Sequence, residues 1–230
     1  ARTARLVNMG EMASTLAHEI NQPLTAVSNY ASGLSARMQS GRLAKAEIAG
    51  VLEKIAVQAQ RAGKIVRHLR DFTRRNQPKY ATVSMNELVA RILEVNAPDL
   101  EQNGIHSVMR TASGSARIDG DPVLIEQVLL NLVRNGAEAM AGLPRDQRQL
   151  TVSVGIEGDN VVVAVSDTGP GLSESMRANL FVPFVSSKPE GMGMGLNICR
   201  SIVELHRGRI WHEPAEAGCT FKFSMPESRK

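Results

Sequence analysis

A change in hydrophobic period near residues 76–80 constrains the fold of this 230-residue chain more than any other feature. Before the change, apolar side chains recur at spacings of three, four and seven over residues 4–39 and again over residues 44–75, the pattern of two long amphipathic helices. Gly41 marks the turn between them. Pro78 and its polar neighbours then end the pattern. The sequence therefore predicts a helical hairpin followed by a unit of different architecture.

The second unit alternates between helical and extended patterns, which predicts an α/β sandwich with helices covering one face of a single mixed sheet. Helices are expected at 84–97, 122–140, 173–180 and 194–206. Strands are expected at 105–110, 115–119, 149–156, 160–166, 208–213 and 218–225. The expected organisation is a helical hairpin over residues 1–76, a linker over 77–83 and an α/β domain over 84–230.

The hairpin by itself has little against which to bury its apolar stripe. Pairing with a second copy of the chain gives a four-helix bundle, so the sequence predicts a homodimer formed through residues 4–75.

The net charge of +4 conceals an asymmetry between the two parts of the chain. Residues 1–80 carry 13 Lys and Arg against 5 Asp and Glu, whereas residues 81–230 carry 14 against 18. A basic half can attract nucleic acid, a membrane surface or an acidic protein, although a solvated helix face also explains such a pattern. No helix-turn-helix, zinc or basic-zipper pattern accompanies the charge, so no contact with nucleic acid is expected.

The two cysteines form neither a disulfide framework nor a metal-ligand spacing, which predicts reduced thiols. The sequence shows no apolar run of the roughly 20 residues that span a bilayer and no secretory signal. We therefore expect a cytoplasmic location without membrane contact. Because the chain begins inside a helical pattern, we also expect a further segment upstream of Ala1.

His18 is the first residue whose type and position suggest chemistry. On a helical wheel it lies about 200° from Leu16, whereas Ile20 lies about 40° from Leu16, so the apolar stripe points inward and His18 toward solvent. A largely neutral imidazole is a nucleophile, and the adjacent Glu19 can accept its proton or orient the ring. The alternative is a surface histidine without a role.

Two polar groups in apolar surroundings suggest a nucleotide site further along the chain. Asn131 and Asn135 stand one turn apart on an otherwise apolar helix, where unpaired amides are costly. Asp167 ends a Val-rich strand and is followed by Gly169 and Gly171, so its carboxylate can accept a hydrogen bond from an exocyclic amine while a base lies against the backbone. Each group alone also has a structural explanation, as a capping amide or a strand-to-loop turn.

Gly191, Gly193 and Gly195 alternate just before an expected helix, an arrangement that favours phosphate. The segment lacks the Gly-Lys-Ser/Thr of a Walker loop and does not directly follow a strand, which argues against a dinucleotide fold.

The segment Ala-His-Glu-Ile-Asn-Gln-Pro-Leu at 17–24 resembles the H-box of the dimerisation and phosphoacceptor domain of sensor histidine kinases, in the variant of the FixL-like subgroup. The resemblance implies that His18 is autophosphorylated, that Glu19 is the neighbouring acid/base, and that Gln22 occupies the phosphatase position, where a polar side chain orients a water.

The later motifs resemble, in family order, the N, G1, F and G2 boxes of the Bergerat ATP-binding fold shared by histidine kinases, DNA gyrase, Hsp90 and MutL. The resemblance implies ATP and Mg²⁺ as ligands, with Asn135 on the metal, Asp167 on adenine, Thr220 supporting that aspartate, and Lys188 on phosphate. The implied nucleotide-binding residues are Asn131, Asn135, Asp167, Gly169, Gly171, Lys188, Gly191, Gly193, Gly195 and Thr220. Phe181 begins the segment that matches the F box.

This chain departs from the family pattern at two positions. Gly136 stands where Ala is common, and Glu138 stands where some relatives place a phosphate-contacting Lys, a role that Lys188 or Arg134 can take over.

The implied function is ATP-dependent autophosphorylation of His18, followed by transfer to an aspartate of a response-regulator receiver domain. The resemblance also implies a sensory domain upstream of Ala1. Two alternatives remain open: an ATP-driven clamp of the gyrase or MutL kind, and a non-enzymatic dimeric scaffold. Phosphohistidine formation separates the first reading from both.

Overall fold

The computed structural model describes residues 2–39, 45–73, 78–111, 114–182, 193, 195–215 and 217–228. The chain divides into two compact units, Ala1–Asn76 and Gln77–Lys230, and each is described by itself. The division falls at the Pro-containing break of the sequence.

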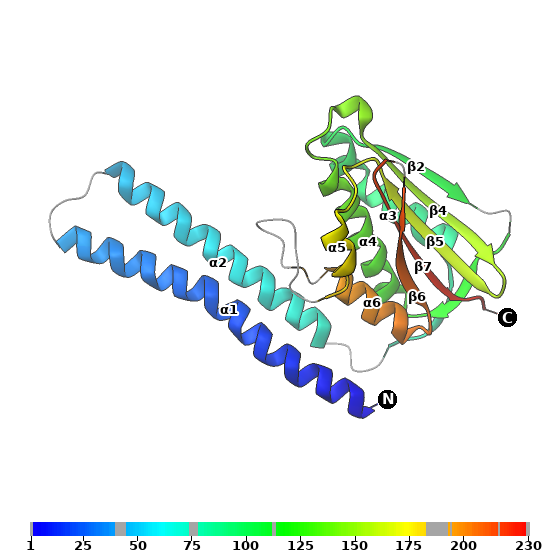
Figure 1. The fold of residues 1–230 in the computed structure, drawn as a ribbon, viewed down its shortest axis with the longest axis horizontal. Helices are drawn as coiled ribbons and strands as arrows, with labels where there is room; N and C mark the ends of the chain where they lie inside the picture. The colour runs from blue at the N-terminus through cyan, green and yellow to red at the C-terminus, as the bar shows by residue number, and fades with distance from the viewer. Residues whose placement is uncertain are drawn as a thin grey trace. The chain divides into compact units, whose positions relative to one another are not determined.

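The first unit is a helical hairpin made of α1 (Arg2–Gln39) and α2 (Lys45–Thr73), close to the predicted helices at 4–39 and 44–75 (Figure 1). Among its described side chains, Pro23 and Ala62 are buried, and the other apolar residues are half-buried or exposed. The large apolar side chains left exposed are Leu24, Tyr30, Met38, Leu52 and Val57. The hairpin therefore buries little of its own apolar surface.

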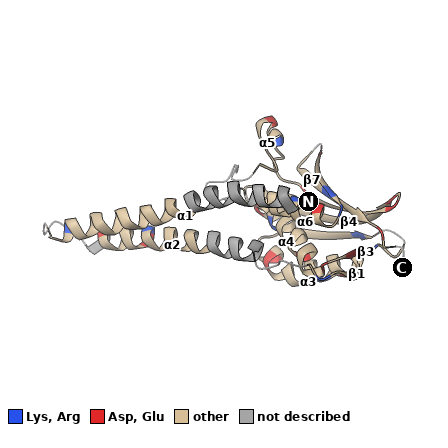
Figure 2. Ribbon diagram, turned by 90° about the horizontal axis from the view of Figure 1, so that it is seen from below, with Lys and Arg blue, Asp and Glu red and all other residues tan. Residues whose placement is uncertain are grey.

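Most of the basic side chains within residues 1–80 lie outside the described set (Figure 2). Those of Arg37, Lys54 and Lys79 are described, and all three are exposed. Lys54 places its ammonium group 5.9 Å from the centre of the Tyr30 ring. The predicted attraction of this region for an acidic partner stays a prediction.

The second unit contains two sheets (Figure 1). The small sheet pairs β1 (Ala81–Ser84) with β3 (Arg117–Gly120) in antiparallel register. The large sheet has the order β2-β4-β5-β7-β6, in which β2 and β4 are parallel and the other pairs antiparallel. Its strands are β2 (His106–Thr111), β4 (Gln149–Glu157), β5 (Asn160–Asp167), β6 (Arg209–Pro214) and β7 (Cys219–Pro226).

The predicted covering of one face of the large sheet by helices is confirmed (Figure 1). The helices that pack on it are α3 (Met85–Gln102), α4 (Pro122–Ala139) and α6 (Gly195–Leu205). The short α5 (Glu174–Ala178) has no buried residue, and a 3₁₀ turn lies at Arg145–Gln147. The core lies between this face and the helices. Residues 161–165 of the central β5 are all buried, and Val161, Val163 and Val165 share one cluster with Val128, Leu129 and Leu132 of α4.

Side-chain caps fix where two of these helices begin. The Ser84 hydroxyl accepts a hydrogen bond from the backbone N–H of Glu87 at 3.4 Å and caps α3. Asp121 accepts from the N–H groups of Val123 and Leu124 at 3.0 and 3.2 Å, and starts the helix that carries the asparagine pair.

The segment predicted as a linker, 77–83, differs from the observed structure. Its last three residues belong to β1, where Val83 is buried opposite Ile118. A strand of four residues is too short for its alternating pattern to stand out against a turn. The described part of the linker therefore belongs to the second unit.

None of the helices in the described part of the chain is both long enough and apolar enough to cross a membrane.

Candidate functional site

α4 carries the asparagine pair. Asn131 and Asn135 are both half-buried and lie one turn apart, as predicted. The Asn131 side chain hydrogen-bonds the Cys199 thiol of α6, and that thiol donates to the carbonyl of Val128 at 3.9 Å. The first asparagine therefore also joins the two helices that cover the sheet.

Asp167 lies at the end of β5 and is 8% exposed. Its neighbours across the ladder are Leu150 on β4 and Cys219 on β7, both buried on the face that the helices cover. The Oδ1 atom accepts a hydrogen bond from the backbone N–H of Gly169 at 2.8 Å. The predicted adenine contact is thus a buried carboxylate whose orientation is held by its own loop.

Gly136, the departure from the family pattern, faces this row of residues. A Cβ atom there would lie 2.7 Å from Cδ1 of Leu150 and 3.3 Å from Cβ of Asp167. The absent methyl group therefore leaves room for Leu150 beside the carboxylate. This packing explains a residue that the sequence shows only as a loss of helix propensity.

Three further glycines bring the backbone close around Asp167. A Cβ at Gly169 would lie 2.8 Å from Oδ1 of Asp167, and one at Gly171 would lie 3.0 Å from the carbonyl oxygen of Gly218. A Cβ at Gly218 would overlap the carbonyl oxygen of Asp167, and its φ of +80° also disfavours any other residue. Gly218 is a site residue that the sequence analysis missed, because its need arises from contact with a distant strand.

Thr220 does not lie where the resemblance suggests. Its hydroxyl is 2.9 Å from that of Ser166, its partner across the ladder. Successive side chains of a strand point to opposite faces, so Thr220 lies on the other face from Asp167, and Cys219 stands opposite the aspartate instead. A shift of one residue along β7 accounts for the difference.

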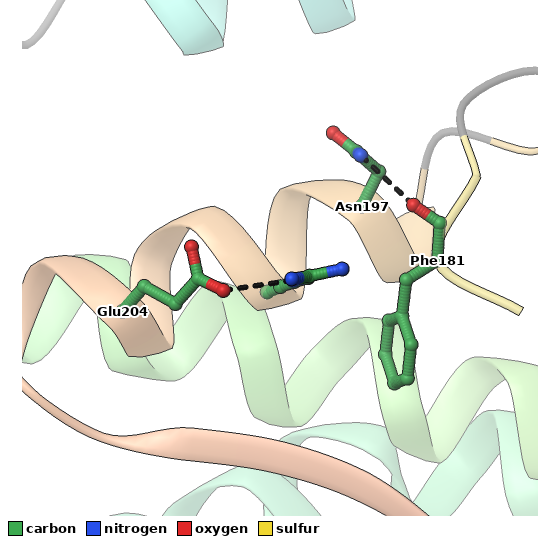
Figure 3. A network of polar contacts seen from close by, with 4 residues as sticks. Phe181, Asn197 and Glu204 are labelled. Carbon is green, nitrogen blue, oxygen red and sulfur yellow. Dashed lines mark hydrogen bonds and ion pairs between the residues drawn. The ribbon is translucent and has the colours of Figure 1, made fainter. Parts of the chain in front are cut away.

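Residues of α6 contact Phe181, which begins the predicted F box (Figure 3). Nδ2 of Asn197 donates a hydrogen bond to the carbonyl oxygen of Phe181 at 3.1 Å. The Arg200 guanidinium lies 5.9 Å from the centre of the Phe181 ring and bonds Glu204 at 2.7 Å. The same helix thus contacts both the asparagine helix and Phe181.

Both cysteines border the candidate site, and neither is poised to react. Burial raises the pKa of the Cys199 thiol to about 12, an effect that the hydrogen bond with Asn131 opposes. Burial also raises the pKa of the Cys219 thiol to about 12, and the negative charge of Asp167 adds to it. The thiols are therefore protonated at neutral pH and act as small buried side chains.

Some of the other predicted site residues are described in the structure, and others are not. His18 and Glu19 lie in α1, but their side chains are outside the described set, and Gln22 is exposed. Gly193 has a φ of +62°, and Gly195 is the first residue of α6. Lys188, Gly191, Pro183 and Phe184 lie outside the described residues.

Arg134 and Glu138 form an ion pair at 2.9 Å on the outer side of α4. Within the described residues, no group of three or more His, Cys, Asp and Glu is arranged to hold a metal ion.

Two protein families match the chain. Residues 8–78 match the family described as His Kinase A (phospho-acceptor) domain, and residues 120–229 match the family described as histidine kinase-, DNA gyrase B-, and HSP90-like ATPase.

Curated relatives align with almost the whole chain. The C4-dicarboxylate transport sensor protein DctS of Rhodobacter capsulatus is 44% identical over 98% of this chain and 35% of DctS. The sensor protein FixL of Bradyrhizobium diazoefficiens is 41% identical over 97% of this chain and 44% of FixL. The chain spans less than half the length of either relative.

Solved structures of histidine kinase ThkA are similar in fold. Its catalytic domain is 31% identical, with a TM-score of 0.59 over 65% of this chain and 96% of that chain. ThkA in complex with response regulator protein TrrA is 27% identical, with a TM-score of 0.75 over 99% of this chain and 64% of that chain.

Proposed function

The chain belongs to the family of sensor histidine kinases, and we propose that it phosphorylates its own His18 from ATP and passes the phosphoryl group to a response regulator. The geometry around Asp167 carries the proposal. This carboxylate is buried at the end of β5, and the backbone N–H of Gly169 holds its Oδ1 atom at 2.8 Å. A carboxylate in that position accepts a hydrogen bond from an exocyclic amine such as adenine N6.

In the proposed first step, a ring nitrogen of His18 attacks the γ-phosphorus of ATP. An N–P bond forms, the bond from phosphorus to the bridging oxygen breaks, and ADP leaves with the electron pair. The proton of the imidazole passes to Glu19, the next residue in the chain. Because phosphoryl transfer depends mainly on positioning and charge, the two units need little more than a correct approach.

In the second step, a carboxylate oxygen of the regulator attacks the same phosphorus. The N–P bond breaks, and His18 is returned to its starting state. The basic residues of the first 80 positions are the proposed attraction for the acidic receiver pocket. Gln22, exposed on α1, is proposed to orient the water of a phosphatase reaction.

The residues of α4 fit Mg²⁺ as a second ligand of the site. The side chain of Asn135 supplies an oxygen of the type that this ion prefers, while phosphate oxygens and waters complete its usual shell. Bound Mg²⁺ would neutralise charge on the transferred phosphoryl group. The proposed phosphate contacts are Asn131, Lys188, Gly191, Gly193 and Gly195.

The exposed apolar residues of the hairpin support the proposed homodimer. Leu24, Met38 and Leu52 lie on helices that bury little by themselves, and a second hairpin would cover them as a four-helix bundle.

Labelling with γ-labelled ATP tests the function. The wild-type chain is expected to take up acid-labile label. His18→Gln should bind ATP with unchanged affinity and take up none, whereas the control His106→Gln, on the exposed start of β2, should label normally. Label on His18→Gln would refute the assignment, and nucleotide-dependent dimerisation without any label would favour the ATP-driven clamp.

A further inference from the structure

Lys79 and Tyr80, which follow the hairpin, make two hydrogen bonds and one ring contact with the rest of the ATP-binding unit. The backbone N–H of Lys79 donates to Oδ2 of Asp121 at 2.9 Å. The hydroxyl of Tyr80 donates to the carbonyl oxygen of Leu205 at 3.1 Å, and its ring centre lies 5.4 Å from that of His206. We call Lys79 and Tyr80 with their partners Asp121 and His206 the connector dock.

His206 is enclosed at the centre of the connector dock. It is 4% exposed, its Nε2 atom accepts the backbone N–H of Asp121 at 3.0 Å, and its Nδ1 atom is 2.7 Å from the carbonyl oxygen of Ile202. With Nε2 accepting, Nδ1 carries the hydrogen and donates to that carbonyl. A Cβ atom at Gly120 would lie 2.8 Å from the ring, so the imidazole packs directly against the backbone of this glycine.

Asp121 links the dock to the nucleotide site. Its Oδ2 atom holds Lys79, while its Oδ1 atom caps α4 through Val123 and Leu124. One carboxylate is therefore shared between the chain that enters the unit and the helix that carries Asn131. A displacement of the Lys79 backbone therefore acts directly on the start of α4.

The contacts of Tyr80 add little to the stability of the unit. Tyr80 is 53% exposed, and its hydrogen bond to Leu205 is exposed as well. An exposed hydrogen bond contributes little to stability, because water competes for both partners. Such contacts are suited to fixing the path of residues 78–80 without being required for folding.

We propose that the connector dock fixes the point from which the ATP-binding unit moves, so that Tyr80 and His206 are positioning residues for the delivery of the γ-phosphate to His18. The described part of the predicted linker, residues 78–83, then moves as part of the ATP-binding unit. The inference rests on the proposed autophosphorylation.

The full chain with Tyr80→Ala is the main test, because His206 is buried and its replacement endangers folding. At saturating ATP, the rate of His18 phosphorylation should fall about tenfold, the scale expected when reacting groups are misplaced. The dissociation constant for ATP should stay within about twofold, because Tyr80 touches no predicted nucleotide residue. Tyr80→Phe, which keeps the ring on His206, should lie between the two. Val95→Ala, at a more exposed site on α3, is the matched control and should change neither value.

Limited trypsin digestion gives a readout that does not depend on kinase activity. Cleavage after Lys79 should be faster in Tyr80→Ala than in the wild type by roughly fivefold, because local opening governs cleavage. If the wild-type chain takes up no label and Tyr80→Ala is still cleaved faster than the wild type, the proposed function is refuted and the connector dock stands. Unchanged cleavage, or a weaker ATP affinity with an unchanged maximal rate, would overturn the dock.

Discussion

The two units of this chain differ in how much of their structure they hold by themselves. The ATP-binding unit buries a continuous core between its sheet and α3, α4 and α6. Among the described side chains of the hairpin, Pro23 and Ala62 are buried, and large apolar groups such as Leu52 are exposed. The ATP-binding unit is therefore self-sufficient, whereas the proposed partner of the hairpin is a second hairpin. Substitutions in the former should affect folding and the site, and substitutions in the latter should affect assembly.

Gly218→Ala is expected to give the largest effect, confined to the ATP-binding unit. The new methyl group would overlap the Asp167 carbonyl at a φ of +80°, so the free energy of unfolding should fall by about 3 kcal/mol or more. Denaturant titration followed by Trp211, the one tryptophan of the chain, reports this unit specifically. Gly142→Ala, where a Cβ meets nothing within 4 Å, is the control. Equal midpoints for the two variants would contradict the packing described.

Leu52→Glu should act on the hairpin alone. A charge on the apolar surface proposed to face a second copy should raise the dimer dissociation constant by about 10- to 100-fold, the cost of losing one buried leucine. Val95→Glu places the same charge at an exposed apolar position of α3 and should leave the dimer intact. Sedimentation equilibrium measures the dimer dissociation constant of each variant. If both variants dissociated, the dimer could not be assigned to the hairpin alone.

Asp167→Asn should weaken nucleotide binding without unfolding the unit. The amide oxygen can still accept from Gly169, but the charged acceptor is lost, so ATP affinity should fall by about 10- to 100-fold. Isothermal titration measures the affinity, and the Trp211 transition checks the fold. Binding at the wild-type level would exclude this carboxylate as the adenine contact.

The smallest expected effect is a pH dependence of the ATP-binding unit. Burial, followed by the charge of Arg177, lowers the pKa of His212 below its ordinary 6.5, while Glu213 acts in the opposite direction. The unfolded chain therefore binds the proton more readily, and the contribution of His212 to stability is complete above pH 6.5 and is lost as the pH falls below it. Unfolding midpoints at pH 7.5 and 5.5 should differ less in His212→Gln than in the wild type. An unchanged difference would assign the pH dependence to other groups.

The sequence alone predicts most elements of this fold closely, since each long helix and each strand of the large sheet has a clear hydrophobic period. α4 was expected at 122–140 and occupies Pro122–Ala139. β1 was missed because four residues carry too little pattern. The helix-borne asparagines were placed correctly because their spacing defines a shared face.

The strand-borne part of the site was harder to predict. An error of one position along β7 moves a side chain to the opposite face of the sheet, which is why Thr220 was expected beside Asp167 and Cys219 lies there. Gly218 and the connector dock depend on contacts between distant segments, and no local pattern contains that information.

The order of strands has a consequence for synthesis of the protein. β6 pairs within the large sheet through β7, which follows β6 in the sequence and lies between β5 and β6. β2 likewise cannot pair before β4 has been made, and the segment that forms α4 lies between these two strands. On the ribosome, the wall opposite Asp167 is missing until Cys219 has emerged, so the proposed adenine contact is incomplete until β7 has been made.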